Sequence, residues 1–340
     1  MEHREFPLIS VLIPTYNRAG YLGEAIESAR EQDYPNFEII VSDNASTDGT
    51  EKRVGKYLSD SRVRYYRNEE NLGNLANYRK LLYEYASGQL GHYLTDDDYF
   101  IDRQHLSKAV RLIQERGVGV VFSAAESRYR DEKVGRSLAL GMEEVLTQEW
   151  WLENLCRTRG GLTIFPSCGS GTLFEIGKAK DLRALWGGPY GDYELALQCI
   201  LSYPRIGYLK EPQYVERRHE EQDGRTSYAN AFQGTMIFQR VYQYGCRVGI
   251  DPATMDQVRL RGFQYFTRAF LLHNWILENG NSLPSLSRFL RELKKFDRRL
   301  PLAALRDPNT MAQFVFYHSV IYRILKKGYL RYRALANRAR

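Results

Sequence analysis

Three adjacent acids, Asp96, Asp97 and Asp98, follow the apolar run Leu90–Leu94. Neighbouring carboxylates repel one another, and a folded protein keeps such a cluster at a strand end chiefly where a cation neutralises it. In extended backbone, Asp96 and Asp98 would point to one side and Asp97 to the other. The triplet therefore predicts that one side binds a hard divalent cation while the other accepts a hydroxyl. Taken alone, it is also typical of an acidic surface turn.

The elements that would position this triplet alternate between strand and helix through the first 120 residues. Apolar, β-branched runs predict strands, and apolar residues at three- and four-residue spacing predict helices. This order predicts right-handed βαβ units, and hence an α/β fold with a mostly parallel sheet flanked by helices. The predicted strands are Leu8–Ile13, Phe37–Val41, Val63–Tyr66 and Leu90–Leu94, and the predicted helices are Arg18–Gln32, Thr50–Leu58, Asn74–Tyr85 and Asp102–Arg116.

Each of these four strands is followed by a polar segment. Ligands of parallel α/β sheets bind beyond the carboxyl ends of the strands, so we expect the four segments to form one binding site. The segments are Pro14–Asn17, Ser42–Asn44, Asn68–Asn71 and Asp96–Asp98.

The first strand is followed by neither a GxGxxG nor a GxxxxGK[ST] loop, so dinucleotide-binding and P-loop chemistry are not indicated. A nucleotide bound without such a loop needs its phosphates neutralised in another way, and a divalent cation on Asp98 would do this. Asp43 could accept a hydrogen bond from a base N–H, and Asp96 one from a ribose hydroxyl. For Asp43 taken alone, the competing interpretation is an Asx turn.

The alternation weakens after Gly117. Val118–Ser123 and Phe165–Phe174 predict strands, Glu149–Cys156 predicts a helix, and from Tyr228 onward the pattern is helical. We therefore expect two regions, a nucleotide-binding and catalytic domain over residues 1–224 and a helical region over residues 225–340.

Composition describes a globular chain of 340 residues that is 43% apolar and 26% charged. Its four cysteines show no metal-site spacing, and neither a signal peptide nor a membrane-spanning run is recognisable. We therefore expect reduced thiols and a cytoplasmic location.

The C-terminal region is strongly basic. Residues 283–340 carry fourteen Lys and Arg against three Asp and Glu, a net of +11, whereas the whole chain carries +7. Such an asymmetry suggests an anionic partner, either a membrane or a nucleic acid. Within this region, Phe314–Leu330 has an apolar stripe flanked by basic residues. That pattern fits a peripheral helix on the inner face of the cell membrane, and equally a helix packed on the main domain with a solvated basic face.

Four ordered motifs make the chain resemble glycosyltransferase family 2. The resemblance is strong over roughly residues 6–120, moderate to residue 222 and absent beyond. It implies an inverting enzyme with the GT-A fold, and the spacing from Asn71 to the Asp triplet is most similar to abequosyltransferase-like and rhamnosyltransferase-like enzymes. The motifs are Ile13–Arg18, Val41–Thr50, Asn71–Gly73 with Asn77, and Asp96–Asp98.

The resemblance also implies roles for individual residues. Asp43 corresponds to the acid that reads uracil or another pyrimidine, Asp96 lies near the ribose, and Asp98 corresponds to the metal-binding position, with Mg²⁺ or Mn²⁺ implied. The full set of implied substrate-binding residues is Pro14, Thr15, Tyr16, Asp43, Asn71, Asp96, Asp97 and Arg218.

The family's catalytic base is an acid at the start of a late helix, and Asp192 in Gly191–Leu197 corresponds to it. A glycine precedes Asp192 where the family usually has Glu. A helix N-terminus would keep this carboxylate ionised, the form a base needs. The competing interpretation is a helix cap. Glu194 is the second candidate, although two residues along a helix it should face elsewhere.

Arg217–His219 resembles the family's Arg-x-His segment near the diphosphate. His219 could bind the metal or the leaving phosphate, and Arg218 could pair with that phosphate; a solvated basic surface is the alternative. Trp150, Trp151 and the stretch Gly169–Thr172 are candidate acceptor-side elements, although helix packing explains the tryptophans equally well.

These observations predict an inverting, metal-dependent glycosyltransferase of surface polysaccharide assembly. It would move one sugar from a nucleotide-diphosphate sugar to a hydroxyl of a glycan or lipid-linked acceptor. A nucleotidyltransferase lacks its usual phosphate loop here, and a nucleic-acid partner is not expected because it leaves the acidic cluster unexplained. A non-catalytic protein that binds a sugar nucleotide or a nucleic acid remains the alternative, and the sequence does not indicate an oligomeric state.

Overall fold

The computed structural model describes residues 6–129, 132–137, 143–155, 158–159, 162–163, 169–188, 190–219, 227–280, 282–306, 311–312 and 315–316.

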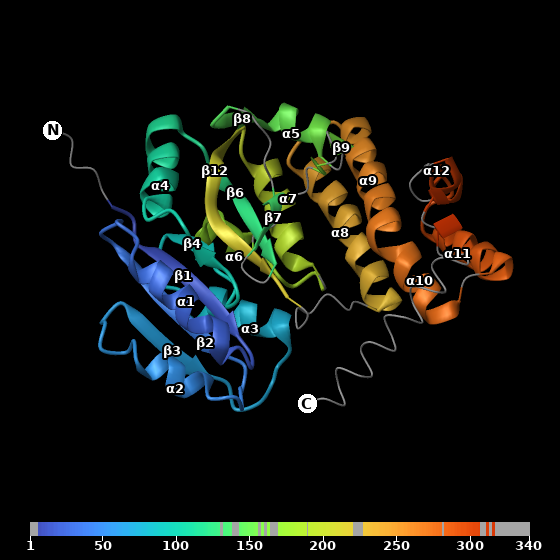
Figure 1. Ribbon diagram of the computed structural model, residues 1–340. Coiled ribbons are helices and arrows are strands. Elements are labelled where there is room, and N and C mark those ends of the chain that lie inside the picture. Colours follow the sequence, from blue (N-terminus) through green and yellow to red (C-terminus); the bar gives the residue numbers. More distant parts are fainter. Residues whose placement is uncertain are drawn as a thin grey trace. The chain divides into compact units, whose positions relative to one another are not determined.

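The strand–helix alternation predicted for the first 120 residues is confirmed (Figure 1). Its four long strands pair in parallel in the order β3-β2-β1-β4, as expected when helices make the connections between them. The elements are β1 (Ile9–Thr15), α1 (Ala19–Arg30), β2 (Phe37–Asp43), α2 (Thr50–Gly55), β3 (Val63–Arg67), α3 (Asn74–Lys80), the π-helical turn η1 (Leu81–Tyr85), β4 (Leu90–Tyr93) and α4 (His105–Arg116).

Beyond residue 100 the sheet becomes mixed, in the order β3-β2-β1-β4-β11-β6-β12-β5. Strand β11 is antiparallel to β4 and β6, whereas β12 is parallel to β6 and antiparallel to β5 and β8. A mostly parallel sheet therefore describes the first four strands only. The further elements are β5 (Tyr99–Phe100), β6 (Val120–Tyr129), β7 (Glu132–Ser137), β8 (Val145–Thr147), α5 (Gln148–Asn154), the separate pair β9 (Thr158–Arg159) and β10 (Leu162–Thr163), β11 (Thr172–Glu175), α6 (Ile176–Asp181), α7 (Gly191–Ser202) and β12 (Arg205–Arg218).

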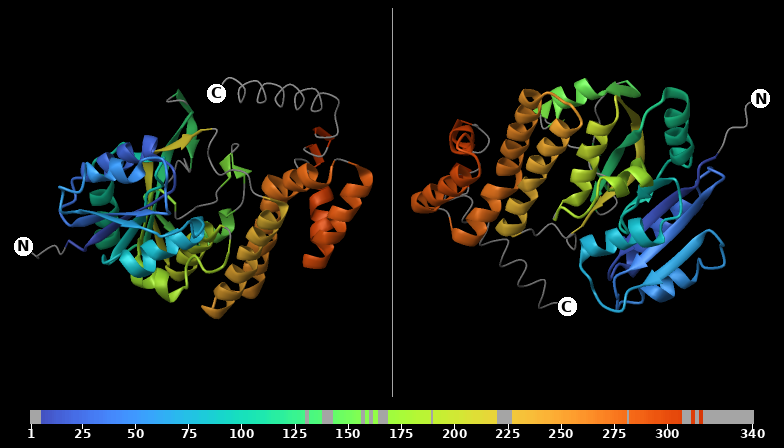
Figure 2. Two further views of the ribbon diagram at one scale, coloured as in Figure 1. Left: turned by 90° about the horizontal axis from the view of Figure 1, so that it is seen from below. Right: turned by 180° about the vertical axis from the view of Figure 1, so that it is seen from behind.

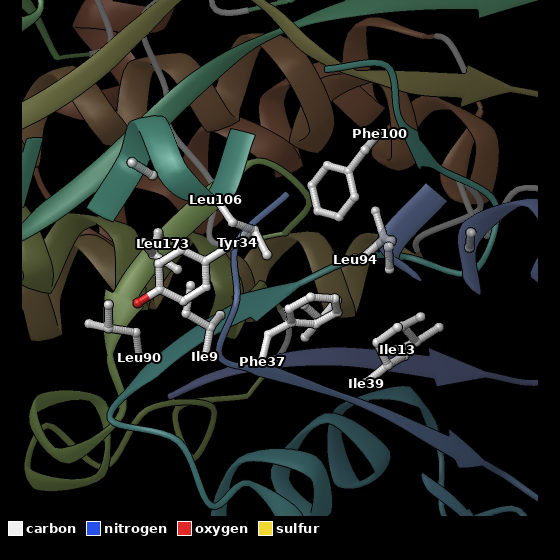
Figure 3. Close-up of a cluster of buried hydrophobic side chains, with 14 of the residues drawn as sticks. Ile9, Ile13, Tyr34, Phe37, Ile39, Leu90, Leu94, Phe100, Leu106 and Leu173 are labelled. Carbon is white, nitrogen blue, oxygen red and sulfur yellow. The ribbon is translucent and has the colours of Figure 1, made fainter. Parts of the chain in front are cut away.

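One face of the sheet packs against α1 and α4 to form the main apolar core. Alternate residues of β1 and β2 point into it, because successive side chains of a strand face opposite sides. Figure 3 shows Ile9, Ile13 and Ile39 in this core together with Phe100 and Leu106. Burial of each such side chain stabilises the fold by about 1.5–3 kcal/mol.

The opposite face of the sheet packs against α3. Ser42 of β2 donates a hydrogen bond to Asn77 Oδ1 at 2.7 Å, and the Tyr93 hydroxyl of β4 donates to the carbonyl of Tyr78 at 3.1 Å. The left view of Figure 2 shows α1 in blue and α3 in cyan on opposite sides of the strands. Helix α3 is thereby fixed beneath the strand ends that carry the predicted site.

The prediction that residues after Tyr228 are helical is confirmed for the described part of that region. By their contacts, residues form two compact units, Met1–Gln222 with Gln239–Val258, and Asp223–Phe238 with Arg259–Arg340. Within the second unit, Phe238 packs edge-on against Phe263 and Phe266. The helices are α8 (Tyr228–Arg247), α9 (Pro252–Phe266), the π-helical turn η2 (Thr267–Leu271), α10 (Leu272–Asn279), α11 (Leu283–Phe296) and α12 (Leu300–Arg306).

In the described part of the chain, no helix combines the length and the hydropathy needed to cross a membrane. Cys156, Cys168 and most of the predicted interfacial helix Phe314–Leu330 lie outside the described residues. The same holds for residues 165–168 of the strand predicted over Phe165–Phe174, of which the structure shows β11 from Thr172.

Candidate active site

The polar segments predicted to converge do so at the carboxyl ends of the parallel strands. In the sheet register Thr15 pairs with Asp43, and Asp43 pairs with Arg67. Backbone hydrogen bonds continue this order beyond the strands, from Asn44 N to Thr15 O at 2.9 Å and from Asn68 N to Asp43 O at 2.8 Å. Ordinary sheet geometry therefore brings residues 14–17, 42–44 and 68–71 to one edge.

At the end of β1, Pro14 and Thr15 are buried, whereas the Tyr16 ring is 45% exposed. Burial raises the pKa of Asp96, and a side-chain hydrogen bond from Thr15 to the Asp96 carboxylate opposes that rise. The end of β1 is therefore connected to the Asp triplet.

Asn71 belongs to a network of asparagine side chains beneath the strand ends. Its Oδ1 accepts hydrogen bonds from Asn44 Nδ2 at 2.7 Å and from Gly73 N at 2.9 Å. Asn44 Oδ1 in turn accepts from Leu72 N at 2.9 Å, and Asn68 Nδ2 donates to Asn77 Oδ1 at 3.0 Å. These bonds show that Asn71 positions the loop before α3; whether it also contacts substrate stays a prediction.

Asp43 is fully buried and accepts three hydrogen bonds. Ser46 N donates to Oδ1 at 2.8 Å, while the Tyr65 hydroxyl and Arg67 Nη1 donate to Oδ2 at 2.6 and 2.9 Å. Asp43 therefore caps the following segment through the amide three residues on, whereas an Asx turn would use the amide two residues on. Burial, together with the hydrogen bond to the Asp43 carboxylate, raises the pKa of the Tyr65 phenol, so that it donates as a neutral group.

The Asp triplet forms a turn, and the expectation that Asp96 and Asp98 share one side of an extended strand is wrong. The turn is closed by a hydrogen bond from Asp98 N to Thr95 O at 3.1 Å. Strand β4 ends at Tyr93, because a turn separates the like charges better than a continued strand would. Burial, reinforced by the charge of Asp97, raises the pKa of both Asp96 and Asp98 to about 7.

The three carboxylates have different surroundings. Asp98 is buried and accepts hydrogen bonds from Thr95 Oγ1 at 2.6 Å and from Arg217 N at 3.0 Å. Asp97 Oδ2 lies 3.0 Å from His219 Nε2. The acid beside the predicted histidine ligand is therefore Asp97, and Asp98 lies beneath it in contact with β12.

Arg217, the first residue of the predicted Arg-x-His segment, was given no role of its own, and it fixes this turn from β12. Its Nη1 donates to the Asp97 carbonyl at 3.0 Å and its Nη2 to Glu24 Oε2 at 2.7 Å. Its guanidinium also lies over the rings of Tyr21 and Tyr99, at 5.2 and 4.9 Å from their centroids. Arg218 points the other way, with a 56% exposed side chain 3.8 Å from Glu216.

His219 stacks on Tyr21 at a centroid distance of 4.8 Å, which fixes the ring beside Asp97. Its Nδ1 is buried without a hydrogen-bond partner in the described part of the chain. Within that part, no group of three or more His, Cys, Asp or Glu side chains converges as a metal site does. A carboxylate and an imidazole nonetheless fit a Mg²⁺ or Mn²⁺ ion that takes most of its remaining ligands from phosphates and water.

Asp192 lies in the first turn of α7, as predicted for the base. The charge of its carboxylate, like the charges of the Asp triplet, affects the pKa of the Tyr78 phenol on α3. Burial, followed by the charges of Asp192, Asp96, Asp97 and Asp98, holds the pKa of Tyr78 well above its usual value. The candidate base and the acidic turn therefore both lie within electrostatic range of the Tyr78 side chain. The sequence offered no signal for Tyr78 beyond its place next to the motif residue Asn77.

Glu194 faces away from this pocket, as the helix geometry predicted. Arg240 of α8 binds its carboxylate through Nε at 2.8 Å and Nη2 at 2.6 Å. Gly187 is required beside this pair, because a Cβ there would lie 2.0 Å from Glu194 Oε2. The paired Glu194 is thus unsuited to act as a base, which leaves Asp192 as the candidate on α7.

The predicted acceptor-side elements divide in two. Trp151 is fully buried against Phe122 at a centroid distance of 5.4 Å, and Trp150 packs perpendicular to it, so packing explains both. In the Gly169–Thr172 stretch, Ser170 Oγ accepts a hydrogen bond from Thr95 N at 3.0 Å. That stretch therefore supports the turn carrying the Asp triplet.

Comparison with known sequences agrees with this geometry. Residues 10–176 match the family described as Glycosyl transferase family 2. A stretch of 118 residues, 34% of this chain and 46% of the relative, is 33% identical to the putative teichuronic acid biosynthesis glycosyltransferase TuaG of Bacillus subtilis. A stretch of 132 residues, 39% of this chain and 51% of the relative, is 30% identical to the UDP-Glc:alpha-D-GlcNAc-diphosphoundecaprenol beta-1,3-glucosyltransferase WfgD of Escherichia coli. The chain thus spans about half the length of these relatives.

Comparison with solved structures shows the fold. The chain is similar to a fragment of TarS from S. aureus in complex with UDP-GlcNAc, with a TM-score of 0.66 at 19% identity over 94% of this chain and 92% of that chain. It is also similar to the mannosyltransferase PcManGT from Pyrobaculum calidifontis in complex with GDP-Man and Mn²⁺, with a TM-score of 0.52 at 18% identity over 92% and 88% of the two chains. The predicted GT-A fold is thereby confirmed.

Proposed function

Because the chain carries a glycosyltransferase family 2 domain, we propose that it transfers one sugar, with inversion, from a nucleotide-diphosphate sugar to a hydroxyl of a glycan or lipid-linked acceptor. The observation that carries this proposal is the convergence of the polar segments at the carboxyl ends of the parallel strands, together with an acid in the first turn of α7. A direct displacement needs a base and a donor-binding cluster in one pocket, since acceptor oxygen, anomeric carbon and leaving group must align.

On the donor side, the exposed Tyr16 ring offers a surface to the nucleotide, and the Thr15 side chain positions the neighbouring Asp96 carboxylate. We assign Asp96 to the ribose and Asp43 to the base. Asp43 already holds three donors, so a base N–H would take the remaining acceptor position of its carboxylate. The UDP-GlcNAc and GDP-Man complexes of the structural neighbours support a nucleotide-diphosphate sugar as donor.

Asp98, Asp97 and His219 are the residues that would hold Mg²⁺ or Mn²⁺, as the Mn²⁺ complex of PcManGT supports. When bound, the cation supplies positive charge that neutralises the departing nucleotide diphosphate. The exposed Arg218 guanidinium, which lies 3.8 Å from Glu216, would add a second positive charge on the same group.

Asp192 would accept the proton of the acceptor hydroxyl as its oxygen attacks the anomeric carbon. The bond from that carbon to the diphosphate breaks on the opposite face, which inverts the configuration. The N-terminus of α7 favours the ionised carboxylate, because the partial positive charge there stabilises an anion. The bidentate Glu194–Arg240 pair holds the same helix turn in place.

The relatives indicate the acceptor class. WfgD acts on a diphosphoundecaprenol-linked sugar, and TarS is a poly(ribitol-phosphate) glycosyltransferase. We therefore place this chain in surface polysaccharide assembly, with residues 1–224 as the catalytic domain. The basic residues 225–340 would contact an anionic membrane surface from the cytoplasmic side. The narrower abequosyltransferase-like or rhamnosyltransferase-like branch stays a prediction.

A thermal-shift series with UDP, dTDP, GDP and CDP, each with and without Mn²⁺, tests the donor site. We expect one nucleotide to stabilise the wild type by about 2–3 kcal/mol near a hundredfold excess over its Kd. This stabilisation should require Mn²⁺ and should be lost in Asp98→Asn, while the exposed Asp181→Asn control retains it. No shift with any nucleotide would contradict the proposal. Binding without consumption of any sugar nucleotide would instead favour the non-catalytic alternative.

A further inference from the structure

Trp186 is the aromatic residue that the proposed function leaves without a role. Its side chain is 61% exposed, whereas Trp151 and Trp275 are buried. It lies in the loop between α6 and α7, six residues before Asp192. Single exposed aromatic side chains are common on protein surfaces, so the exposure of Trp186 matters because its loop leads into the turn that carries Asp192.

Side chains from α3 and η1 hold this loop in place. The Arg79 guanidinium lies 4.5 Å from the centroid of the Trp186 ring, and its Nη1 donates to the Leu185 carbonyl at 3.4 Å. The Tyr83 hydroxyl donates to the Ala184 carbonyl at 3.0 Å, and its ring meets Trp186 edge-on at 6.1 Å. The indole is therefore fixed by its neighbours while most of its surface remains open.

The backbone of the loop is strained, and it returns to the start of α7. Arg183, Leu185 and Tyr190 have φ of 52°, 68° and 65°, in the left-handed region that non-glycine residues avoid. The Leu185 Cα lies 3.0 Å from the place that a Cβ on Gly191 would occupy. The strained conformation thus presents Trp186 next to the turn that carries Asp192, which is the pattern of a preorganised binding loop.

The charges around the indole are positive. Burial raises the pKa of the Tyr83 phenol, and the charges of Arg79 and Arg183 oppose that rise, which places both guanidinium groups near Tyr83. Arg183 is exposed, and in the described part of the chain neither arginine pairs with a carboxylate. Arg79 is held against the indole, whereas Arg183 is exposed, and guanidinium groups beside an aromatic face suit a ring that carries an anionic group.

We propose that Trp186, Arg79 and Arg183 form the acceptor subsite, in which a sugar ring packs on the indole while a phosphate or carboxylate next to that ring pairs with the arginines. This inference rests on the proposed function and names its acceptor as an anionic glycan. The apolar C–H face of a pyranose matches a flat indole surface, and an acceptor held there has its next hydroxyl near Asp192. The donor residues Asp43 and Asp96 come from other strand ends, so the two substrates occupy different parts of the site.

Saturation-transfer NMR on the full chain, in saturating UDP and Mg²⁺ to block the donor site, tests the subsite. The probes are glucose 1-phosphate, methyl glucuronide and the neutral methyl glucoside. We expect transfer to the sugar C–H protons in the wild type, a loss of about fivefold or more in Trp186→Ala, and retention in Trp186→Phe, which keeps a flat ring. Phe6→Ala removes another exposed aromatic ring, at the other end of β1, and should change nothing.

Arg183→Gln tests the charge. It should weaken glucose 1-phosphate, methyl glucuronide or both while leaving methyl glucoside unchanged, and Arg111→Gln, another exposed arginine, is the matched control. The comparison of the two anionic probes tells phosphate from carboxylate. The absence of sugar signals in the wild type, equal signals in Trp186→Ala, or no response to Arg183→Gln would overturn the inference.

UDP affinity, measured by calorimetry on the same variants, separates this inference from the proposed function. UDP or another nucleoside diphosphate should bind Trp186→Ala as it binds the wild type. If nucleotides bind but the sugar signals do not depend on Trp186, only the subsite is wrong. If no nucleoside diphosphate binds the wild type, the proposed function fails, and the subsite fails with it.

Discussion

The residues proposed for the donor at the ends of β1 to β4 and those proposed for the acceptor between α6 and α7 are held by different kinds of contact. On the donor side, Thr15, Asp43 and Arg67 are neighbours in one parallel ladder, so main-chain hydrogen bonds set their spacing. On the acceptor side, Trp186 and Asp192 depend on side chains from distant parts of the chain, among them Arg79 and Arg240.

The two sides should therefore differ in how well they tolerate substitutions. A ladder allows little change, because a shift in register would move every side chain of the strand to the other face. A loop held by an arginine stack and a few hydrogen bonds can be rebuilt by single substitutions without disturbing the sheet. We infer that nucleotide binding is a property of the sheet edge, whereas acceptor specificity is decided in the loop before α7.

The largest effect is expected at Asp192, where a substitution should lower turnover without changing nucleotide affinity. Asp192→Asn keeps the shape of the side chain but removes the base, and we expect turnover to fall by about 10²–10⁴. Nucleotide affinity should stay at the wild-type value, since the donor residues come from the sheet edge. Steady-state transfer assays and calorimetry measure the two quantities. Glu194→Gln, which alters an acid of the same helix turn, serves as the control for an indirect structural effect.

A small loss of turnover in Asp192→Asn, with Glu194→Gln equally affected, would show that the helix turn matters but that Asp192 is not the base. The acceptor side would then not supply the catalytic base.

The donor side could be predicted from the sequence because its signals are local. Each strand is a short apolar run, and each polar segment follows directly, so periodicity and the rules for parallel sheets were sufficient. The conformation of the Asp triplet was predicted wrongly. The strand pattern before the triplet led us to predict extended backbone for Asp96–Asp98. These residues instead form a turn, closed by the hydrogen bond from Asp98 N to Thr95 O.

The acceptor side resisted prediction because its determinants are distant in sequence. Strand β12 was missed, since Lys210, Glu211 and Pro212 interrupt its alternation where the pairing with β6 shifts register. Without that strand, the pleat that turns Arg217 inward and Arg218 outward could not be predicted. Tyr78 and Trp186 were missed for a related reason, as nothing local distinguishes them from the chain's other aromatic residues.

The next expected effect concerns the stability of the donor side towards acid. His92 of β4 and His105 of α4 are buried with their Nε2 atoms 3.0 Å apart. Burial lowers the pKa of both, and that of His105 to about 4, below the value near 6.5 of the unfolded chain. Below pH 6.5 the unfolded chain binds protons that the folded core excludes, so the free energy of unfolding should fall by roughly 2 kcal/mol at pH 5 from His105 alone.

Asp96 and Asp98 act in the opposite direction, because their raised pKa lets the folded protein take up protons first. The difference between the wild type and His105→Asn, followed by urea unfolding from pH 7 to pH 5, isolates the histidine contribution. The wild type should lose stability relative to the variant as the pH falls. Parallel curves for the two proteins would show that the histidine pair is not excluded from protonation.

The smallest effects concern the two neighbouring arginines of β12. We expect one substitution to lower stability and the other to lower nucleotide affinity. Arg217 is buried and ties the Asp97 carbonyl to Glu24, so Arg217→Met should lower the free energy of unfolding by about 2 kcal/mol. Arg218 is exposed, so Arg218→Met should leave stability within about 0.5 kcal/mol. Its nucleoside diphosphate affinity should nevertheless fall by roughly fivefold, since a charge-assisted hydrogen bond to phosphate is lost.

Urea unfolding and calorimetry on the same two proteins measure both effects. A loss of stability in Arg217→Met alone and a loss of affinity in Arg218→Met alone would assign Arg217 to the structure of the acidic turn and Arg218 to nucleotide binding. Equal losses of stability in Arg217→Met and Arg218→Met would mean that the two side chains contribute equally to stability, although one is buried and the other exposed. An unchanged nucleotide affinity in Arg218→Met would remove Arg218 from the donor site and leave the phosphate to the acidic turn and the cation proposed there, since Arg218 is the exposed arginine at the described end of β12.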